Sequence, residues 1–164
     1  MYQILGLQQK NLFANISAEE REQEGFVTVV HTFDLLKKMN EVCPHIIAMA
    51  GMKVIGYALC MHPKFASEIE LLKPMFQEIK IVAPSIHKYI VMGQICIAKD
   101  YRNKGIFNKL YITMLQSVHP EFDTIITEVN VNNQRSLNAH YALGFTHLKT
   151  HMSKGENWNL IALK

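Results

Sequence analysis

A long apolar run followed by a glycine turn and an amphipathic segment constrains the fold of this chain more than any other feature. The run YIVMGQICIA is rich in Ile and Val and predicts a buried strand. The segment after Gly105 repeats apolar residues at helical spacing, as Leu110 and Met114 show, and predicts a helix. The stretch DYRNKG therefore lies on a strand-to-helix turn, where backbone N–H groups lack partners and the helix dipole concentrates positive potential. Such a turn suits an anion, above all a phosphate.

The bulk composition is that of an ordinary globular protein. Its 164 residues fit one domain, residues 1–164, which is long enough to bury a core. Hydrophobic residues make up 49% and charged residues 19%, which excludes a disordered chain. The formal net charge of +3 suits an anionic ligand, but it falls short of the basic excess of a dedicated nucleic-acid binder.

No segment predicts secretion or membrane insertion. The N-terminus lacks a basic start followed by an apolar block, and no apolar run approaches the length of a membrane span. The cysteines Cys43, Cys60 and Cys96 are odd in number and lie in apolar surroundings. We therefore expect buried free thiols and a cytoplasmic protein.

The eight histidines do not predict a metal site. They form no His-Glu-x-x-His pattern, and the cysteines form no Cys-x-x-Cys pair. His147 and His151 lie in a predicted strand, where an even separation only places both side chains on one face. We expect no bound metal.

The first third of the chain predicts one strand and two helices. Tyr2 to Leu7 is interpreted as a short first strand. Ser17 and Glu20 have the capping-box arrangement, which predicts a helix that ends near Gly25. Thr32 opens a second predicted helix, FDLLKKMNEV.

The rest of the chain predicts a mixed sheet. Two apolar runs around Gly51 predict a β-hairpin, and the irregular stretch Pro63 to Lys88 is expected to hold a helix or two. Strand, helix, strand and helix follow, and two more strands joined near Gly155 close the chain. One α/β sheet, antiparallel at its start and parallel in its middle, accounts for this order.

Two blocks in the second half of the chain resemble a known family. The segment Ile97–Phe107, IAKDYRNKGIF, resembles the acyl-CoA loop of the GNAT superfamily of N-acetyltransferases. The segment Glu128–Phe145, EVNVNNQRSLNAHYALGF, is similar to that superfamily's Asn-x-x-Ser/Ala…Gly-Phe helix. The blocks stand in the right order, and the resemblance spans essentially the whole chain.

The resemblance implies a fold and a co-substrate. The fold would be a twisted, mostly antiparallel sheet of about six to seven strands with a splayed parallel central pair and about four helices. The pantetheine arm of acetyl-CoA would lie between the splayed strands, and backbone amides from Arg102 to Asn108 would hold the pyrophosphate. The implied cofactor-binding residues are Ile95, Cys96, Ile97, Arg102, Asn103, Lys104, Gly105, Ile106, Phe107, Asn108, Asn133 and Ser136. Relatives usually have Gly or Ala where this chain has Phe107, so its ring must point away from the phosphates.

The resemblance also implies direct attack of an amine on the thioester in a ternary complex. The amine must be neutral, which at pH 7 holds for on the order of one lysine in 10³ but for roughly one α-amine in ten. Glu128 matches the position of the base in relatives that acetylate protein N-termini. A carboxylate in an apolar strand is costly unless it is used or paired, so a structural role also stays open.

The acid that protonates the leaving thiolate is less defined. Relatives commonly use a tyrosine at the position of His140, and here Tyr141 follows one residue later. One residue is about 100° of helix rotation, so the two side chains cannot occupy the same place. His140, Tyr141 and solvent are the candidates.

The favoured hypothesis is therefore an acetyl-CoA-dependent N-acetyltransferase that acts on a small amine or on a peptide or protein amine. The alternative is an acyl-CoA-binding sensor without catalysis, which the residues His140 and Phe107 motivate. Nucleic acid and membranes are not expected partners. Many relatives form homodimers, and the resemblance allows one here.

Overall fold

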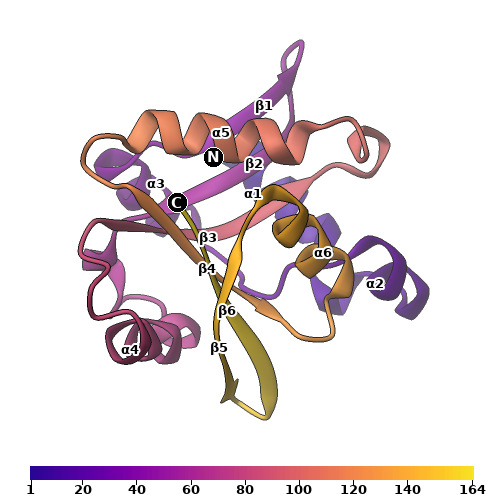
Figure 1. Ribbon diagram of the computed structural model, residues 1–164. Coiled ribbons are helices and arrows are strands. Elements are labelled where there is room, and N and C mark those ends of the chain that lie inside the picture. Colours follow the sequence, from indigo (N-terminus) through magenta and orange to yellow (C-terminus); the bar gives the residue numbers. More distant parts are fainter.

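Six strands form one sheet in the computed structural model, which describes residues 1–164 apart from the side chain of Leu71. Their order across the sheet is β1-β2-β3-β4-β6-β5 (Figure 1). Only β3 and β4 run parallel, so the expected mixed sheet with a parallel central pair is confirmed. The strands are β1 (Ile46–Ala50), β2 (Lys53–Met61), β3 (Tyr89–Ile97), β4 (Thr124–Asn130), β5 (Thr146–Ser153) and β6 (Glu156–Leu163).

Six α-helices flank the sheet, rather than about four. They are α1 (Tyr2–Asn11), α2 (Ala18–Glu24), α3 (Phe33–Val42), α4 (Lys73–Val82), α5 (Ile106–Val118) and α6 (Gln134–Leu143). Single 3-10 turns are η1 (Phe13–Asn15), η2 (Pro63–Phe65), η3 (Glu70–Leu72) and η4 (Lys99–Tyr101). None of the helices in the described residues combines the length and the apolar character that crossing a bilayer requires.

Strand residues alternate between two cores, one on each face of the sheet. Helices α1, α3 and α4 pack with Tyr57 of β2 and Ile126 of β4 on one face. Helices α5 and α6 pack with the neighbouring residues Ala58 and Ile125 on the other face. In Figure 1, α5 lies along β1 and β2, while α4 lies toward β5.

The first helix boundaries follow the expected caps. Ser17 Oγ accepts a hydrogen bond from the Glu20 backbone N–H at 3.1 Å, at the start of α2. Thr32 Oγ1 accepts one from the Leu35 N–H at 3.3 Å, at the start of α3. Gly25 ends α2 with φ of 77°, a value that favours glycine. These predicted boundaries are confirmed.

The predicted strand at Tyr2 to Leu7 is wrong, because this segment begins α1. Ile4 and Leu7 share the buried face of the helix with the polar residues Gln8 and Asn11. Buried positions therefore recur every three or four residues, but half of them are polar. Hydropathy alone could not show this helical period.

A register shift in β5 separates His147 from His151. Against β6, His147 pairs with Ile161 whereas Lys149 pairs with Leu160, so β5 contains one extra residue. His151 consequently lies on the α4 side of the sheet and is buried, while His147 is exposed. The expectation that both lie on one face is wrong.

Candidate active site

The site begins where β3 and β4 part. Their pairing covers three residue pairs and ends with Val91 and Ile126 in the described chain. Beyond this point β3 stays paired only with β2. The Ala98 N–H bonds to Ile55 of β2, and N–H direction alternates along a strand, so the N–H groups of Ile95 and Ile97 face the gap.

The turn before α5 presents a row of backbone donors. Asn103 and Gly105 adopt left-handed conformations with φ of 59° and 72°. No backbone acceptor among the described residues pairs with the N–H groups of residues 103–108. Consecutive free N–H groups in such a turn, at the positive end of a helix dipole, form an anion-binding concavity.

A cavity of about 550 Å³ lies between this turn, the open edge of β3 and α6. Eleven of the twelve predicted cofactor-binding residues line it: Ile95, Cys96, Ile97, Arg102, Asn103, Gly105, Ile106, Phe107, Asn108, Asn133 and Ser136. The exception is Lys104, whose Nζ donates to the carbonyl of Asp100 at 2.8 Å. The structure thus brings together residues that are far apart in the sequence.

The Arg102 guanidinium is engaged by protein groups. It donates to Glu24 of α2 at 2.6 Å, to Asn11 of α1 at 2.6 Å and to the Ile97 carbonyl at 3.1 Å. Its hydrogen bond to Glu24 lowers the pKa of that carboxyl. Arg102 therefore joins three elements around the cavity, and the turn contributes its main chain to the cavity wall.

Phe107 leaves the cavity open. Its ring packs edge-on against Tyr111 and His140, with centroid distances of 5.1 and 5.0 Å. The ring thereby becomes part of the apolar core under α5 and α6. The cavity volume remains beside it.

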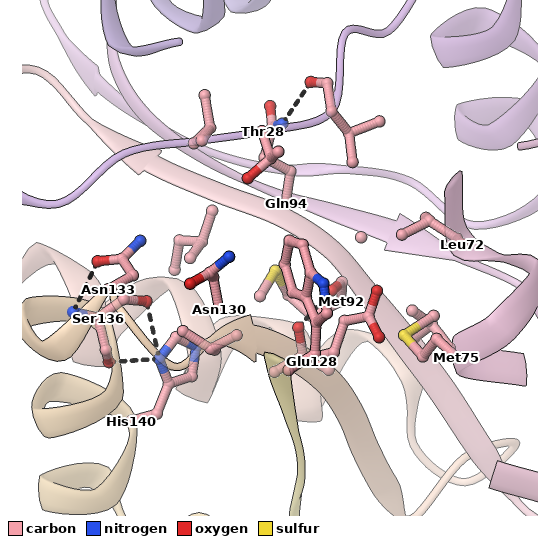
Figure 2. A pocket seen from close by; sticks show the side chains of 18 of the residues that line it. Thr28, Leu72, Met75, Met92, Gln94, Glu128, Asn130, Asn133, Ser136 and His140 are labelled. Atoms are coloured by element: carbon pink, nitrogen blue, oxygen red, sulfur yellow. Dashed lines mark hydrogen bonds between the residues drawn. The ribbon is translucent and has the colours of Figure 1, made fainter. Parts of the chain in front are cut away.

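A second, smaller cavity of about 80 Å³ adjoins the first. Five residues line both: Phe26, Val27, Ile95, Asn133 and Ser136. Its apolar lining residues include Leu72, Met75, Met92 and Trp158. Glu128 is the one carboxyl group among the described lining residues, and no lysine or arginine of the described chain lines this cavity. Figure 2 shows Glu128 beside Met75, near the middle of the cavity.

Glu128 is buried and has one polar partner within the described residues. Its side chain is 8% exposed, and Oε2 lies 3.0 Å from His151 Nε2. Burial raises the pKa of Glu128 to about 8 and lowers that of His151. Both shifts favour the uncharged pair, in which the carboxyl donates a hydrogen bond to the imidazole.

His140 is a neutral ring with both nitrogens engaged. Nδ1 lies 2.7 Å from the Ser136 carbonyl, and because a carbonyl can only accept, Nδ1 carries the proton and donates it. Nε2 of the neutral ring therefore accepts from the Tyr111 hydroxyl at 2.7 Å. Burial lowers the pKa of His140 to about 4. The ring borders the smaller cavity, held to α6 by the hydrogen bonds drawn in Figure 2.

Of two other candidates, Tyr141 lies outside both cavities and Cys96 lies in the larger one. Tyr141 is 39% exposed, and its hydroxyl accepts a hydrogen bond from Asn159 at 3.4 Å. Neither cavity includes it among its described lining residues. Cys96 lines the larger cavity, but burial raises the pKa of its thiol to about 12.

Sequence reasoning missed two groups of functional interest. Arg135 lines the larger cavity and donates to Asn103 across it, linking α6 to the turn. Gln94 is buried and donates to the Val29 carbonyl at 2.8 Å, which fixes the loop over the smaller cavity. Arg135 lay within the recognised block and could have been found there. Gln94 carried no signal, because its partners are distant in sequence.

Metal binding finds no support in the described residues, where no three His, Cys, Asp or Glu side chains cluster.

Comparisons with known proteins identify the fold and the family. The model of the acetyltransferase (GNAT) family matches residues 11–145. No curated protein matches the chain. Among solved structures, smu.2055 from Streptococcus mutans UA159 is 18% identical with a TM-score of 0.66, covering 99% of this chain and 92% of that one.

Two further structures are similar and contain ligands. The NatC complex bound to Gag peptide and CoA is 17% identical with a TM-score of 0.63, covering 99% of this chain and 88% of the other. The Salmonella typhimurium protein yncA with its cofactor acetyl-CoA is 14% identical with a TM-score of 0.57, covering 83% and 75%. At these identities the structures show a shared fold.

Proposed function

Because this chain belongs to the GNAT family of acetyltransferases, we propose that it moves an acetyl group from acetyl-CoA to a primary amine in a ternary complex. The observation that carries the proposal is the meeting of two cavities where β3 and β4 part. One offers free backbone amides, and the other holds a buried carboxyl. The donor and the acceptor would approach each other from opposite sides of this junction.

The larger cavity fits acetyl-CoA in its chemistry. The free N–H groups of residues 103–108 suit the pyrophosphate, as at other helix N-termini. The gap-facing N–H groups of Ile95 and Ile97 suit the amide-containing pantetheine arm. Arg135 adds positive charge beside the turn. Acetyl-CoA would supply an activated thioester, and the residues of this chain would bind and orient it.

The smaller cavity suits an amine carried by a neutral or apolar group. Its apolar lining includes Leu72, Met75, Met92 and Trp158. No cationic side chain in the described lining would pair with a carboxylate on the acceptor. A small apolar amine or the α-amine of a peptide fits these features. The NatC structure, which holds a Gag peptide, supports the peptide acceptor.

Glu128 would accept the proton that the amine releases. Its carboxyl is the one acidic group in the described lining of the acceptor cavity. Because burial raises its pKa to about 8, the carboxylate form grows through pH 7 to 9. His140 is a poor proton donor here, since it is neutral and both of its nitrogens are hydrogen-bonded. A thiolate with a pKa near 8.5 can take its proton from solvent, so no dedicated acid is required.

The test is a calorimetric titration with acetyl-CoA, with CoA and ATP as comparison ligands, followed by turnover on a panel of amines and peptides. We expect micromolar binding of acetyl-CoA that ATP does not reproduce, and a kcat that rises with a midpoint near pH 8. Glu128→Gln should bind acetyl-CoA normally and lower kcat by about 10²- to 10⁴-fold. Undetectable binding would contradict the proposal.

The same experiment separates catalysis from sensing. Normal binding of acetyl-CoA without turnover on any acceptor would favour the acyl-CoA sensor. The observation that favours this second candidate is that both ring nitrogens of His140 are already hydrogen-bonded within the protein.

A further inference from the structure

Glu128 and His151 form a buried pair that bridges three strands. Glu128 of β4 pairs with Leu160 of β6, and His151 of β5 pairs with Trp158, so the two side chains meet diagonally across β6. The extra residue in β5 puts His151 on this face. Their side chains are 8% and 4% exposed, and the distance of 3.0 Å makes a hydrogen bond.

We propose that His151 is a positioning residue that holds the Glu128 carboxyl and takes up the proton that this carboxyl must lose before it can act as a base. This inference rests on the proposed function. It adds a residue outside both recognised sequence blocks. His151 has no place in the larger cavity or among the described lining residues of the smaller one.

The geometry defines a balanced proton path. In the resting pair, Glu128 donates its proton to the unprotonated Nε2 of His151. Transfer of that proton leaves a carboxylate beside an imidazolium, which a short charge-assisted hydrogen bond stabilises. As the C–N bond forms and the C–S bond breaks, the amine proton passes to the carboxylate and the electron pair leaves with sulfur. The imidazolium then releases its Nδ1 proton to water, and the thiolate takes one from water. Exchange of the remaining ring proton from Nε2 to Nδ1 through water restores the resting pair.

The far side of His151 is open to such an exchange. Nδ1 makes no hydrogen bond to the described residues. Unlike the unpartnered ring nitrogens of His31 and His45, it is not fully buried. The Glu78–Lys149 ion pair, 2.7 Å between its charged atoms, lies beside it on α4 and β5. Glu78 favours the imidazolium and Lys149 disfavours it, so the two partly cancel.

The charged and titratable groups around Glu128 are few. Helix α4 contributes Glu78, β5 contributes Lys149 and His151, and α6 contributes His140, which is held neutral by burial. Only His151 is in hydrogen-bond contact with the carboxyl in the described structure. Among the described side chains, only His151 is therefore placed to exchange a proton directly with this carboxyl.

Two substitutions separate holding from proton uptake. His151→Leu removes the one polar partner that Glu128 has among the described residues, so the charged carboxylate loses its hydrogen bond. His151→Gln keeps a side-chain amide that can bond to the carboxyl but cannot accept a proton. His147→Gln, on the exposed face of the same strand, is the matched control.

The measurements are the pH profile of kcat, acetyl-CoA affinity, and the titration midpoint of the Glu128 carboxyl carbon by NMR in ¹³C-glutamate-labelled protein. We expect His151→Leu to raise the carboxyl midpoint by about one pH unit or more. His151→Gln should lower the kcat plateau by about 10- to 100-fold, within the range of general acid–base effects. His147→Gln should change neither, and all variants should bind acetyl-CoA like the wild type.

The outcomes separate this inference from the proposed function. If the wild-type protein turns over no amine, both the proposed function and the proton uptake by His151 are wrong. The NMR midpoint still tests whether His151 stabilises the Glu128 carboxylate. An unchanged midpoint in His151→Leu, or a full plateau in His151→Gln, would overturn the role of His151. Thermal melts of both variants establish that each is folded.

Discussion

Glu128 shows what a single buried group contributes at the residue scale. An ordinary glutamate is charged at neutral pH, but this carboxyl keeps its proton because its surroundings are dry. A group whose pKa is raised by folding supports the fold fully below its unfolded pKa of about 4.5, and that support is lost as pH rises through the folded value of about 8. Replacing Glu128 by a residue that cannot ionise should therefore remove this pH dependence of the free energy of unfolding.

We expect Glu128→Gln to leave stability near the wild-type value at pH 5 and to exceed it at pH 9. At about 1.4 kcal/mol per pKa unit, the gain at pH 9 is on the order of a few kcal/mol. Urea unfolding at both pH values measures it. Glu22→Gln, at an exposed position of α2, serves as the control. Equal effects of Glu128→Gln at the two pH values would refute the raised pKa.

Two tyrosines whose hydroxyl groups have different hydrogen-bond partners test the protonation assigned to His140. Tyr111 is fully buried and donates to His140, whereas Tyr141 is 39% exposed and bonds weakly to Asn159. Tyr111→Phe leaves the His140 Nε2 unpaired, at a cost of about 1–3 kcal/mol. Tyr141→Phe should stay within about 0.5 kcal/mol of the wild type. Denaturant unfolding compares the two, and a reversed order would contradict the hydrogen-bond assignment.

The turn that begins α5 is the feature that matters most at the element scale. Gly105 has φ of 72°, and the space where a Cβ would stand is empty of protein atoms within 4 Å in the described structure. A side chain there would be strained by its backbone conformation alone. It would also project beside the amides proposed to bind phosphate.

Gly105→Ala should destabilise the protein by about 1 kcal/mol and weaken acetyl-CoA binding. Gly51→Ala is the matched control, because Gly51 has φ of 58° and the same open surroundings but lies in the β1–β2 hairpin. It should lose similar stability and keep its affinity. Calorimetry and thermal melts of both variants give the comparison, and equal affinities would remove the turn from the binding site.

The molecule as a whole is two half-sheets joined by the short β3–β4 pairing, with the proposed donor site in the gap. A ligand that binds across this gap should stabilise the native state. At 100 times its Kd, acetyl-CoA would add about 2.7 kcal/mol, which for this chain length is a rise of roughly 5–10 °C in Tm.

Hydrogen exchange can show which amides are protected by bound acetyl-CoA. The amides of Ile95 and Ile97 face the gap and should gain protection when acetyl-CoA binds. The amide of Cys96 points to β2 by the same alternation and should change little. Equal protection of all three would indicate global stabilisation in place of contact with the β3 edge.

Features fixed by neighbouring residues were readable from the sequence. The caps at Ser17 and Thr32 and the glycine turn at Gly105 follow from local patterns. The family resemblance, rather than a local pattern, pointed to eleven of the residues that line the larger cavity. The misread α1 shows the limit, because Gln8 is buried only through partners such as Gln94, far along the chain.

Glu128 was a candidate from the sequence, but its partner His151 was not, for the same reason. The Glu128–His151 contact depends on three strands and on one extra residue in β5. No local sequence pattern predicts the position of that extra residue. The state of His140 likewise depends on Tyr111 of another helix. Residue identity suggested candidates, but burial decided their protonation.

The early parting of β3 and β4 also bears on how such a protein can evolve. If the donor is held largely by peptide groups of β3 and of the turn before α5, most side chains nearby are free to drift without loss of the donor. Mutations in the acceptor cavity could then retune the choice of amine while the acetyl source stays constant. The short β3–β4 pairing would thus separate a donor site that stays constant from an acceptor site that can change.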